Sequence, residues 1–167
     1  MNAGAYGRDW SDVLIDVTVI DADGSRTVTP DELGLSYRHS DLEPGEVVAH
    51  ARFALEPRPA GEVKSRVAEL LAQRKATQPT NRRTFGSVFK NPEHELGAGR
   101  MVEECGLKGH TAGGARISPV HANFIENAGG ATSADAIALM VEARSRVHDR
   151  FGVVLEHEVR FLGPLEL

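Results

Sequence analysis

Hydrophobic and polar residues alternate in two early stretches of the chain, as they do in β-strands that expose one face. The first, "VLIDVTVID" at residues 13–21, is rich in β-branched side chains, which favour strands. The turn "DADG" follows, with Gly24 where a positive φ is favoured, and predicts a hairpin into "SRTVTP". The second stretch, residues 46–55, is expected to place five side chains on one strand face: Val47, Ala49, Ala51, Phe53 and Leu55.

Helical spacing begins after residue 58. Residues 59–76 carry apolar side chains at intervals of four, three and one, which predicts a helix with one buried face made of Val63, Val67, Leu70 and Leu71. Arg74 extends that face near the end of the helix. The polar stretch "KATQPTNRRT" comes next and is broken by Pro79, so it is the most plausible domain boundary.

Two more helices are predicted from their end signals. A short one covers residues 98–105, and Gly106 is a good candidate for its stop. The other begins at a capping box, Thr132 with Asp135, and ends near "FG" at residues 151–152.

The remaining regular segments read as strands. In "TFGSVFKNP" (residues 84–92), alternation would point Ser87, Phe89 and Asn91 one way and Val88 and Lys90 the other. In residues 153–163, one face would carry Glu156, Glu158 and Arg160, and the opposite face Leu155, His157, Val159 and Phe161. Strands and helices mixed in this way predict an α+β chain.

Composition narrows the class of protein. The chain has 167 residues, of which 41% are hydrophobic and 26% charged, as is ordinary for a folded globular protein. Its net charge of -5 argues against broad binding to nucleic acids or anionic membranes. No apolar run reaches the roughly 18 residues that span a bilayer, and Cys105 is the single cysteine, so we expect a cytoplasmic protein. The histidines show no ligand spacing, and no metal is expected.

Ser87 heads the first group of candidate functional residues. Gly86 permits close approach of a ligand or another backbone, and Lys90 and Asn91 add a cation and an amide. This group could hold a phosphorylated or carboxylated substrate. The alternative is a serine that caps a turn or hydrogen-bonds locally. A nucleophilic serine is the weaker idea, because no His/Asp partner lies nearby in the sequence.

The last strand supplies the second group, Glu156, Glu158 and Arg160. One interpretation is a solvated strand face with an internal ion pair. The other is a carboxylate beside an arginine in a cleft, where it would act as an acid or base or stabilise charge.

Five motifs occur in one order along the chain: "MNAGAYG", "YRHS", "GSVFKNP", "GLKG" with "GGARISPVHANFIEN", and "FGVVLEHEVRFLG". This succession closely resembles the C-terminal two-thirds of the UDP-N-acetylenolpyruvoylglucosamine reductase (MurB) family of peptidoglycan synthesis. The resemblance runs over practically the whole chain and is strongest over residues 84–163. It implies an enzyme that uses FAD and NADPH to reduce UDP-N-acetylglucosamine enolpyruvate to UDP-N-acetylmuramate.

The resemblance also implies roles for individual residues. Ser87 matches the serine that protonates the carbanionic carbon after hydride transfer, and Glu158 and Arg38 match residues that stabilise the enolate. The positions that match residues facing the UDP-sugar are Arg74, Lys90, Asn91 and His121. The positions that match the flavin-side wall are Asn2, Gly4, Ala5 and Tyr6. Val88 is a departure, because the family usually has phenylalanine there.

Two parts of the chain follow from the same resemblance: a partial flavin-side domain over residues 1–78 with 151–167, and a substrate-binding domain over residues 79–150. Family members begin with an FAD-binding domain, whereas this chain begins at "NAGAYG". We therefore expect an N-terminally truncated chain that does not hold FAD tightly alone and exposes apolar surface. The alternative is a UDP-sugar-binding module without redox activity.

Overall fold

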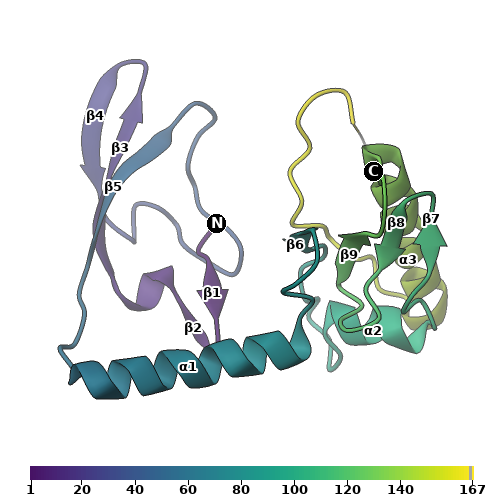
Figure 1. Ribbon diagram of the computed structural model, residues 1–167. Helices are drawn as coiled ribbons and strands as arrows, with labels where there is room; N and C mark the ends of the chain where they lie inside the picture. Colours follow the sequence, from purple (N-terminus) through teal and green to yellow (C-terminus); the bar gives the residue numbers. More distant parts are fainter. Residues whose placement is uncertain (166) are drawn as a thin grey trace. The chain divides into compact units, whose positions relative to one another are not determined.

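Helices and antiparallel strands are mixed along the chain in the computed structural model, which describes residues 1–165 and 167 (Figure 1). The predicted α+β class is confirmed. The chain forms two compact units, Met1–Ala60 and Gly61–Leu167. This division differs from the expected one at residue 78, and residues 151–167 lie in the second unit.

The first unit contains a small hairpin and a three-stranded sheet. Strands β1 (Gly4–Ala5) and β2 (Arg8–Asp9) form the hairpin, and a 3-10 helix, η1 (Trp10–Asp12), follows. The sheet has the order β4-β3-β5, with strands β3 (Leu14–Asp21), β4 (Gly24–Val28) and β5 (Val47–Phe53). Gly24 has a φ of 141°, so the predicted β3–β4 hairpin and its glycine turn are confirmed.

One face of this sheet builds the core of the first unit. The buried side chains are Leu14, Val17, Val19, Val28 and Leu33. From β5, Val48 and Ala51 pack against them, whereas Val47 and Phe53 are exposed, so the predicted β5 face is wrong. The cause is a register shift. Thr18 pairs with His50 and Val19 with Val48, which leaves Ala49 as an extra residue that reverses the alternation.

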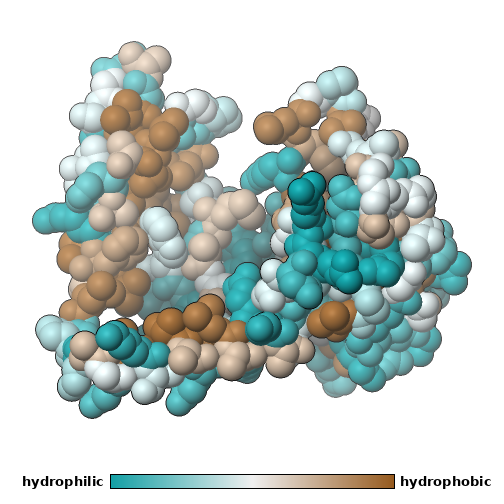
Figure 2. Space-filling view, in the orientation of Figure 1, coloured by the Kyte–Doolittle hydropathy of each residue, from teal (hydrophilic) through white to brown (hydrophobic). Residues whose placement is uncertain are grey.

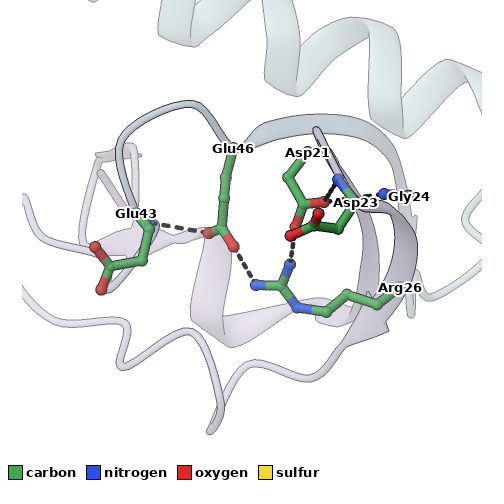
Figure 3. A network of polar contacts seen from close by, with 6 residues as sticks. All are labelled: Asp21, Asp23, Gly24, Arg26, Glu43 and Glu46. Carbon is green, nitrogen blue, oxygen red and sulfur yellow. Dashed lines mark hydrogen bonds and ion pairs between the residues drawn. The ribbon is translucent and has the colours of Figure 1, made fainter.

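Arg26 joins the β3–β4 turn to the residues before β5 (Figure 3). Its guanidinium donates to the Asp21 carboxylate at 3.0 Å and pairs with Glu46. Asp21 also accepts from the N–H groups of Asp23 and Gly24, which closes the turn. Arg26 is half exposed, so this network fixes geometry more than it adds stability.

The second unit contains a four-stranded antiparallel sheet and three helices. The sheet order is β6-β9-β8-β7, with β6 (Thr84–Ser87), β7 (Thr111–Ala112), β8 (Ala115–Ile117) and β9 (Phe124–Asn127). The helices are α1 (Ala60–Thr77), α2 (Ala98–Glu104) and α3 (Ser133–Phe151). Side chains from α2, α3 and the sheet form one core that includes Met101, Val102, Ile117, Ile125, Leu139, Met140 and Val147.

The end signals of α2 and α3 are confirmed. Thr132 and Asp135 form the capping box of α3, and Gly152 ends that helix with a φ of 69°. Gly106, with a φ of 73°, follows α2. These helix ends could be predicted from the sequence because a cap depends on residues close together in the chain.

Helix α1 forms where it was predicted, but its buried face is wrong. None of its residues is buried, and Val63, Val67 and Leu71 are 46%, 48% and 61% exposed. Figure 2 shows apolar residues on the surface along this helix. The periodicity therefore records an apolar stripe that no other described part of the chain covers, in keeping with the expected exposure of apolar surface.

Residues 153–163 run beside the end of β6 without forming a regular strand. Their pairing is one isolated bridge, Phe89 with His157. The predicted apolar face is confirmed, since Leu155 is buried and Val159 and Phe161 pack on the core of the second unit. The longer β6 strand is wrong. The strand stops at Ser87, and the next two residues, Val88 and Phe89, are both buried.

Candidate functional site

Ser87 stands at the exposed end of β6, just after an irregular step in the strand. Gly86 has a φ of 90°, and the pairing of β6 with β9 shifts register between Thr84 and Ser87. Among residues 1–165 and 167, no group hydrogen-bonds to the Ser87 hydroxyl. The hydroxyl is therefore accessible to a ligand at a point where the strand no longer follows regular alternation.

Asn123 holds the backbone that follows Ser87. Its side-chain Oδ1 accepts from the Phe89 N–H at 2.9 Å, and its Nδ2 donates to the Phe89 carbonyl at 2.8 Å. Its own carbonyl accepts from the Val88 N–H at 2.9 Å. Asn123 is 5% exposed. The sequence analysis gave Asn123 no role. Its place inside the apolar run "ANFI" could have indicated one, because an amide that is buried with its neighbours must find hydrogen-bond partners.

His121 lies two residues before Asn123 and is half-buried. Its Nδ1 accepts from the Asn123 N–H at 3.2 Å, and its ring meets the edge of Phe124 with centroids 5.1 Å apart. A Cβ on Gly99 would lie 2.7 Å from His121 Cε1, so only glycine lets α2 approach the ring this closely. Burial lowers the pKa of His121, and the charge of Lys108 lowers it further. The imidazole is therefore neutral near pH 7 and carries its proton on Nε2.

Lys90 and Asn91 already have protein partners. Lys90 Nζ lies 2.6 Å from Glu156 Oε1, and this hydrogen bond lowers the pKa of Glu156. Asn91 Oδ1 accepts from the N–H of Ala98, the first residue of α2, at 3.0 Å. Gly97 makes room for that bond, because a Cβ there would lie 2.9 Å from Asn91 Oδ1. Asn91 thus fixes the start of α2.

Glu158 lies beside the Ser87 segment through backbone pairing. Its N–H donates to the Val88 carbonyl at 2.8 Å, and the Lys90 N–H donates to the Glu156 carbonyl at 2.8 Å. Glu158 is half-buried, whereas Glu156 and Arg160 are exposed. The carboxylate of Glu156 pairs across to Lys90, so Glu156 and Glu158 both lie along the segment that follows Ser87.

The first unit brings Arg38 onto the N-terminal hairpin. Arg38 Nη2 donates to the Gly4 carbonyl at 3.3 Å, and its guanidinium lies 4.9 Å from the Tyr37 ring centroid. A Cβ on Gly4 would lie 2.8 Å from the Arg8 carbonyl, so the hairpin itself requires this glycine. Asn2 is buried, and its Oδ1 accepts from the Ser11 N–H at 3.1 Å.

The other residues predicted to bind ligands are exposed. Ala5 and Tyr6 lie at the tip of the hairpin, where Tyr6 has a φ of 54°. Arg74 lies in the last turn of the exposed helix α1. The structure gives these three side chains no role in packing a core.

A separate cavity of about 500 Å³ in the second unit is lined by Arg160, but by none of the residues to which the family resemblance gives a role. It is lined mainly by apolar side chains from the sheet, α3 and the C-terminal segment, among them Phe85, Ile125, Met140 and Phe161. Over residues 1–165 and 167, no cluster of His, Cys, Asp and Glu suits a metal ion. Over the same residues, no helix has both the length and the hydropathy that crossing a bilayer requires.

Comparison with known proteins gives consistent matches. Residues 78–162 match the family model "UDP-N-acetylenolpyruvoylglucosamine reductase, C-terminal domain". The chain is 48% identical over 165 residues to the UDP-N-acetylenolpyruvoylglucosamine reductase of Agathobacter rectalis, covering 98% of this chain and 52% of that protein. It is 47% identical over 163 residues to that of Anaeromyxobacter dehalogenans, covering 98% and 49%. The chain thus spans about half the length of these relatives.

A solved structure extends the match to three dimensions. The crystal structure of UDP-N-acetylenolpyruvylglucosamine reductase (MurB) from Thermus caldophilus is 39% identical with a TM-score of 0.82, covering 96% of this chain and 57% of that chain. The family model accounts for about half of this chain, and the relatives align along nearly all of it. The chain therefore belongs to the UDP-N-acetylenolpyruvoylglucosamine reductase (MurB) family.

Proposed function

We propose that the chain supplies the substrate-binding and proton-donating part of a UDP-N-acetylenolpyruvoylglucosamine reductase, which acts in the cytoplasm in peptidoglycan synthesis and so supports cell shape. The substrate is UDP-N-acetylglucosamine enolpyruvate. One observation carries the proposal. The 2.8 Å bond from the Glu158 N–H to the Val88 carbonyl sets a carboxylate-bearing residue beside the segment that carries the Ser87 hydroxyl.

The proton-donating role suits Ser87. Addition of a hydride to the enolpyruvyl group leaves negative charge on the carbon that bears the carboxylate, and a nearby O–H can protonate that carbon. A serine hydroxyl is a weak acid in water, so it needs charged or polar neighbours that stabilise the developing anion. We assign that stabilisation to the Arg38 guanidinium in the first unit, as a cation, and to Glu158 in the second, as a hydrogen-bonding acid, the residues that match the family pattern.

Substrate binding is assigned to four residues with donor groups. Lys90 offers a cation whose present partner, Glu156, is exposed and easily displaced by a phosphate. His121 is neutral and offers Nε2–H as a donor, since its Nδ1 is occupied by Asn123. Asn91 and Arg74 complete the set. Residues 79–150 would form the substrate-binding domain, and residues 1–78 with 151–167 would belong to the flavin side.

FAD supplies the hydride in this family and NADPH reduces it, but the residues described in the first unit do not make a full flavin site. Asn2 and Gly4 serve the hairpin itself, as the buried Asn2 amide and the close Arg8 carbonyl indicate. Of the four predicted flavin-side residues, Ala5 and Tyr6 are the exposed ones that could contact a ring system.

The test is binding of UDP-N-acetylglucosamine enolpyruvate to the chain, measured by calorimetry, with Ser87→Ala and Lys90→Ala as variants. The proposal predicts that Lys90→Ala weakens binding, whereas Ser87→Ala leaves it nearly unchanged and abolishes any turnover with FAD and NADPH. Absence of binding by the unmodified chain would contradict it. Binding with turnover that survives Ser87→Ala would refute the proton-donating role. Binding without turnover would favour the alternative, a UDP-sugar-binding module.

A further inference from the structure

We propose that Asn123 is a positioning residue: its side-chain amide holds the segment of residues 87–91 in the conformation that binds the UDP-sugar. The inference rests on the proposed function, because it concerns the segment that carries Ser87, Lys90 and Asn91. Asn123 itself is 5% exposed and would touch no ligand. Its effect would pass through the backbone of Phe89.

Three hydrogen bonds run from Asn123 to the two residues after Ser87. Oδ1 accepts from the Phe89 N–H, Nδ2 donates to the Phe89 carbonyl, and the Asn123 carbonyl accepts from the Val88 N–H, all within 2.8–2.9 Å. One side chain therefore satisfies both backbone groups of Phe89. Aspartate or leucine of similar size could not do so, because only an amide carries a donor and an acceptor side by side at every pH.

Residues 87–91 depend on these three hydrogen bonds because β6 ends too early to hold the residues that follow Ser87. The strand stops at Ser87, and its last step contains Gly86 at a φ of 90°. A Cβ at Gly86 would have no neighbour within 4 Å, so side-chain packing does not fix that step. Beyond it, Asn123 supports one side of the backbone and the bridge to His157 supports the other.

Asn123 also links this segment to His121. The Asn123 N–H donates to His121 Nδ1 at 3.2 Å, which leaves Nε2–H as the remaining donor of the imidazole. A Cβ on Gly99 would come within 3.3 Å of Asn123 Cβ and within 2.7 Å of His121 Cε1, so α2 packs on both residues. The histidine and the Ser87 segment thus share one buried support.

The experiment uses the full chain with Asn123→Ala, Asn123→Asp and the matched control Asn127→Ala. Asn127 is the last residue of β9, the strand that follows Asn123, but its Oδ1 accepts from the N–H groups of Gly129 and Ala131 in a turn outside the proposed site. Three quantities are measured: affinity for UDP-N-acetylglucosamine enolpyruvate, hydrogen exchange of the Phe89 amide by NMR, and the thermal midpoint. Asn123→Ala should speed Phe89 exchange and weaken the affinity, each about tenfold, while Asn127→Ala leaves both unchanged.

Asn123→Asp keeps the side-chain volume, so it provides a second test if Asn123→Ala fails to fold. At about pH 7 its carboxylate accepts from the Phe89 N–H but repels the Phe89 carbonyl, so affinity should again fall about tenfold. Protonation at about pH 5 restores a donor, and affinity relative to the unmodified chain should recover. The comparison at each pH is with the unmodified chain, which also contains His121. Recovery of affinity without a matching rise in the thermal midpoint separates positioning from a role in folding stability alone.

The proposal is overturned if Asn123→Ala binds the sugar as well as the unmodified chain, or if Asn127→Ala loses as much affinity. It is also overturned if acid brings no recovery in Asn123→Asp. Failure of the proposed function gives a different result, in which the unmodified chain does not bind the sugar. In that case the hydrogen-exchange rate of the Phe89 amide tests whether Asn123 positions the segment. Faster exchange in Asn123→Ala, with unchanged exchange in the Ile117 and Ile125 core, supports positioning, and unchanged Phe89 exchange rejects it.

Discussion

Lys90 is ion-paired with Glu156 in the unliganded chain, with Nζ and Oε1 2.6 Å apart. The pair connects the segment after β6 to the C-terminal segment. The side chain of Glu156 is 70% exposed, whereas that of Lys90 is 22% exposed. A phosphate arriving at Lys90 must therefore compete with a carboxylate that can swing into solvent.

Glu156→Gln should increase the affinity for the UDP-sugar, because it removes this competitor while keeping the side-chain shape. An exposed ion pair is worth about 0.2–1 kcal/mol, so the dissociation constant should fall by up to about fivefold. Calorimetric titration at low and high salt measures the change. Glu142→Gln, which breaks the exposed pair with Arg146 on α3, is the control and should leave affinity unchanged. Weaker binding in Glu156→Gln would show that Glu156 helps to hold the ligand.

Glu126 should account for part of the acid sensitivity of the second unit. Its side chain is 2% exposed and lies 2.6 Å from Arg116 across β8 and β9. Burial raises the pKa of Glu126, but hydrogen bonds from Arg116 and Ser118 outweigh burial and leave the pKa below its ordinary value. The stabilisation is therefore fully present above the unfolded-state pKa of about 4.3 and is lost as the pH falls through the lower native value.

Glu126→Gln should lower the free energy of unfolding by about 1–3 kcal/mol at neutral pH, because Arg116 loses its charged partner. Its stability should also depend less on pH below about 4.3 than that of the unmodified chain. Urea unfolding followed by circular dichroism at several pH values gives both quantities. Glu69→Gln on the exposed helix α1 serves as the reference substitution. Identical pH profiles for Glu126→Gln and the unmodified chain would contradict the assignment.

The isolated chain should not retain FAD. Of the four positions that match the flavin-side wall, Asn2 is buried and Gly4 serves the hairpin itself, which leaves Ala5 and Tyr6 for a flavin. An absorption spectrum after incubation with FAD and gel filtration tests this expectation. A flavin band that survives filtration would show a complete cofactor site and would call for assays of NADPH oxidation.

Gly86→Ala should destabilise the second unit and weaken sugar binding. A Cβ at this position meets no atom within 4 Å, so the cost comes from the backbone, whose φ of 90° disfavours an L side chain by about 1–2 kcal/mol. Unfolding curves and calorimetry measure the two effects. Gly61→Ala in α1 also adds a methyl group in open space without a positive φ, and should be neutral or slightly stabilising. Equal stability of the two variants would rule out backbone strain at Gly86.

The parts of the fold that could be predicted are those encoded by neighbouring residues. The turn at Gly24 and the capping box of Thr132 and Asp135 depend on local backbone shape and side-chain reach. The inward face of β5 could not be predicted, because Ala49 is an extra residue only relative to β3, a strand far away in sequence. The exposure of α1 could not be predicted either, since periodicity gives an apolar stripe without saying what covers it.

The candidate site shows the same limit. Ser87 and Glu158 were named from motifs, and the structure adds that the Glu158 N–H bonds to the residue after Ser87. That Lys90 pairs with Glu156, and that Asn91 caps α2, depends on partners elsewhere in the chain. Asn123 was missed because its role is to bond a backbone 34 residues away in sequence.

The backbone at Gly86 adopts a conformation that a D-amino acid favours. Its φ of 90° lies where a residue of opposite chirality is relaxed. Glycine is the only encoded residue that reaches this shape cheaply, but it also leaves the unfolded chain its greatest freedom. A D-alanine placed there by chemical ligation would keep the native bend and restrict the unfolded chain, so it should stabilise the fold where L-alanine weakens it. At position 86, directly before Ser87, a D-residue should therefore give a more stable fold than any of the genetically encoded residues.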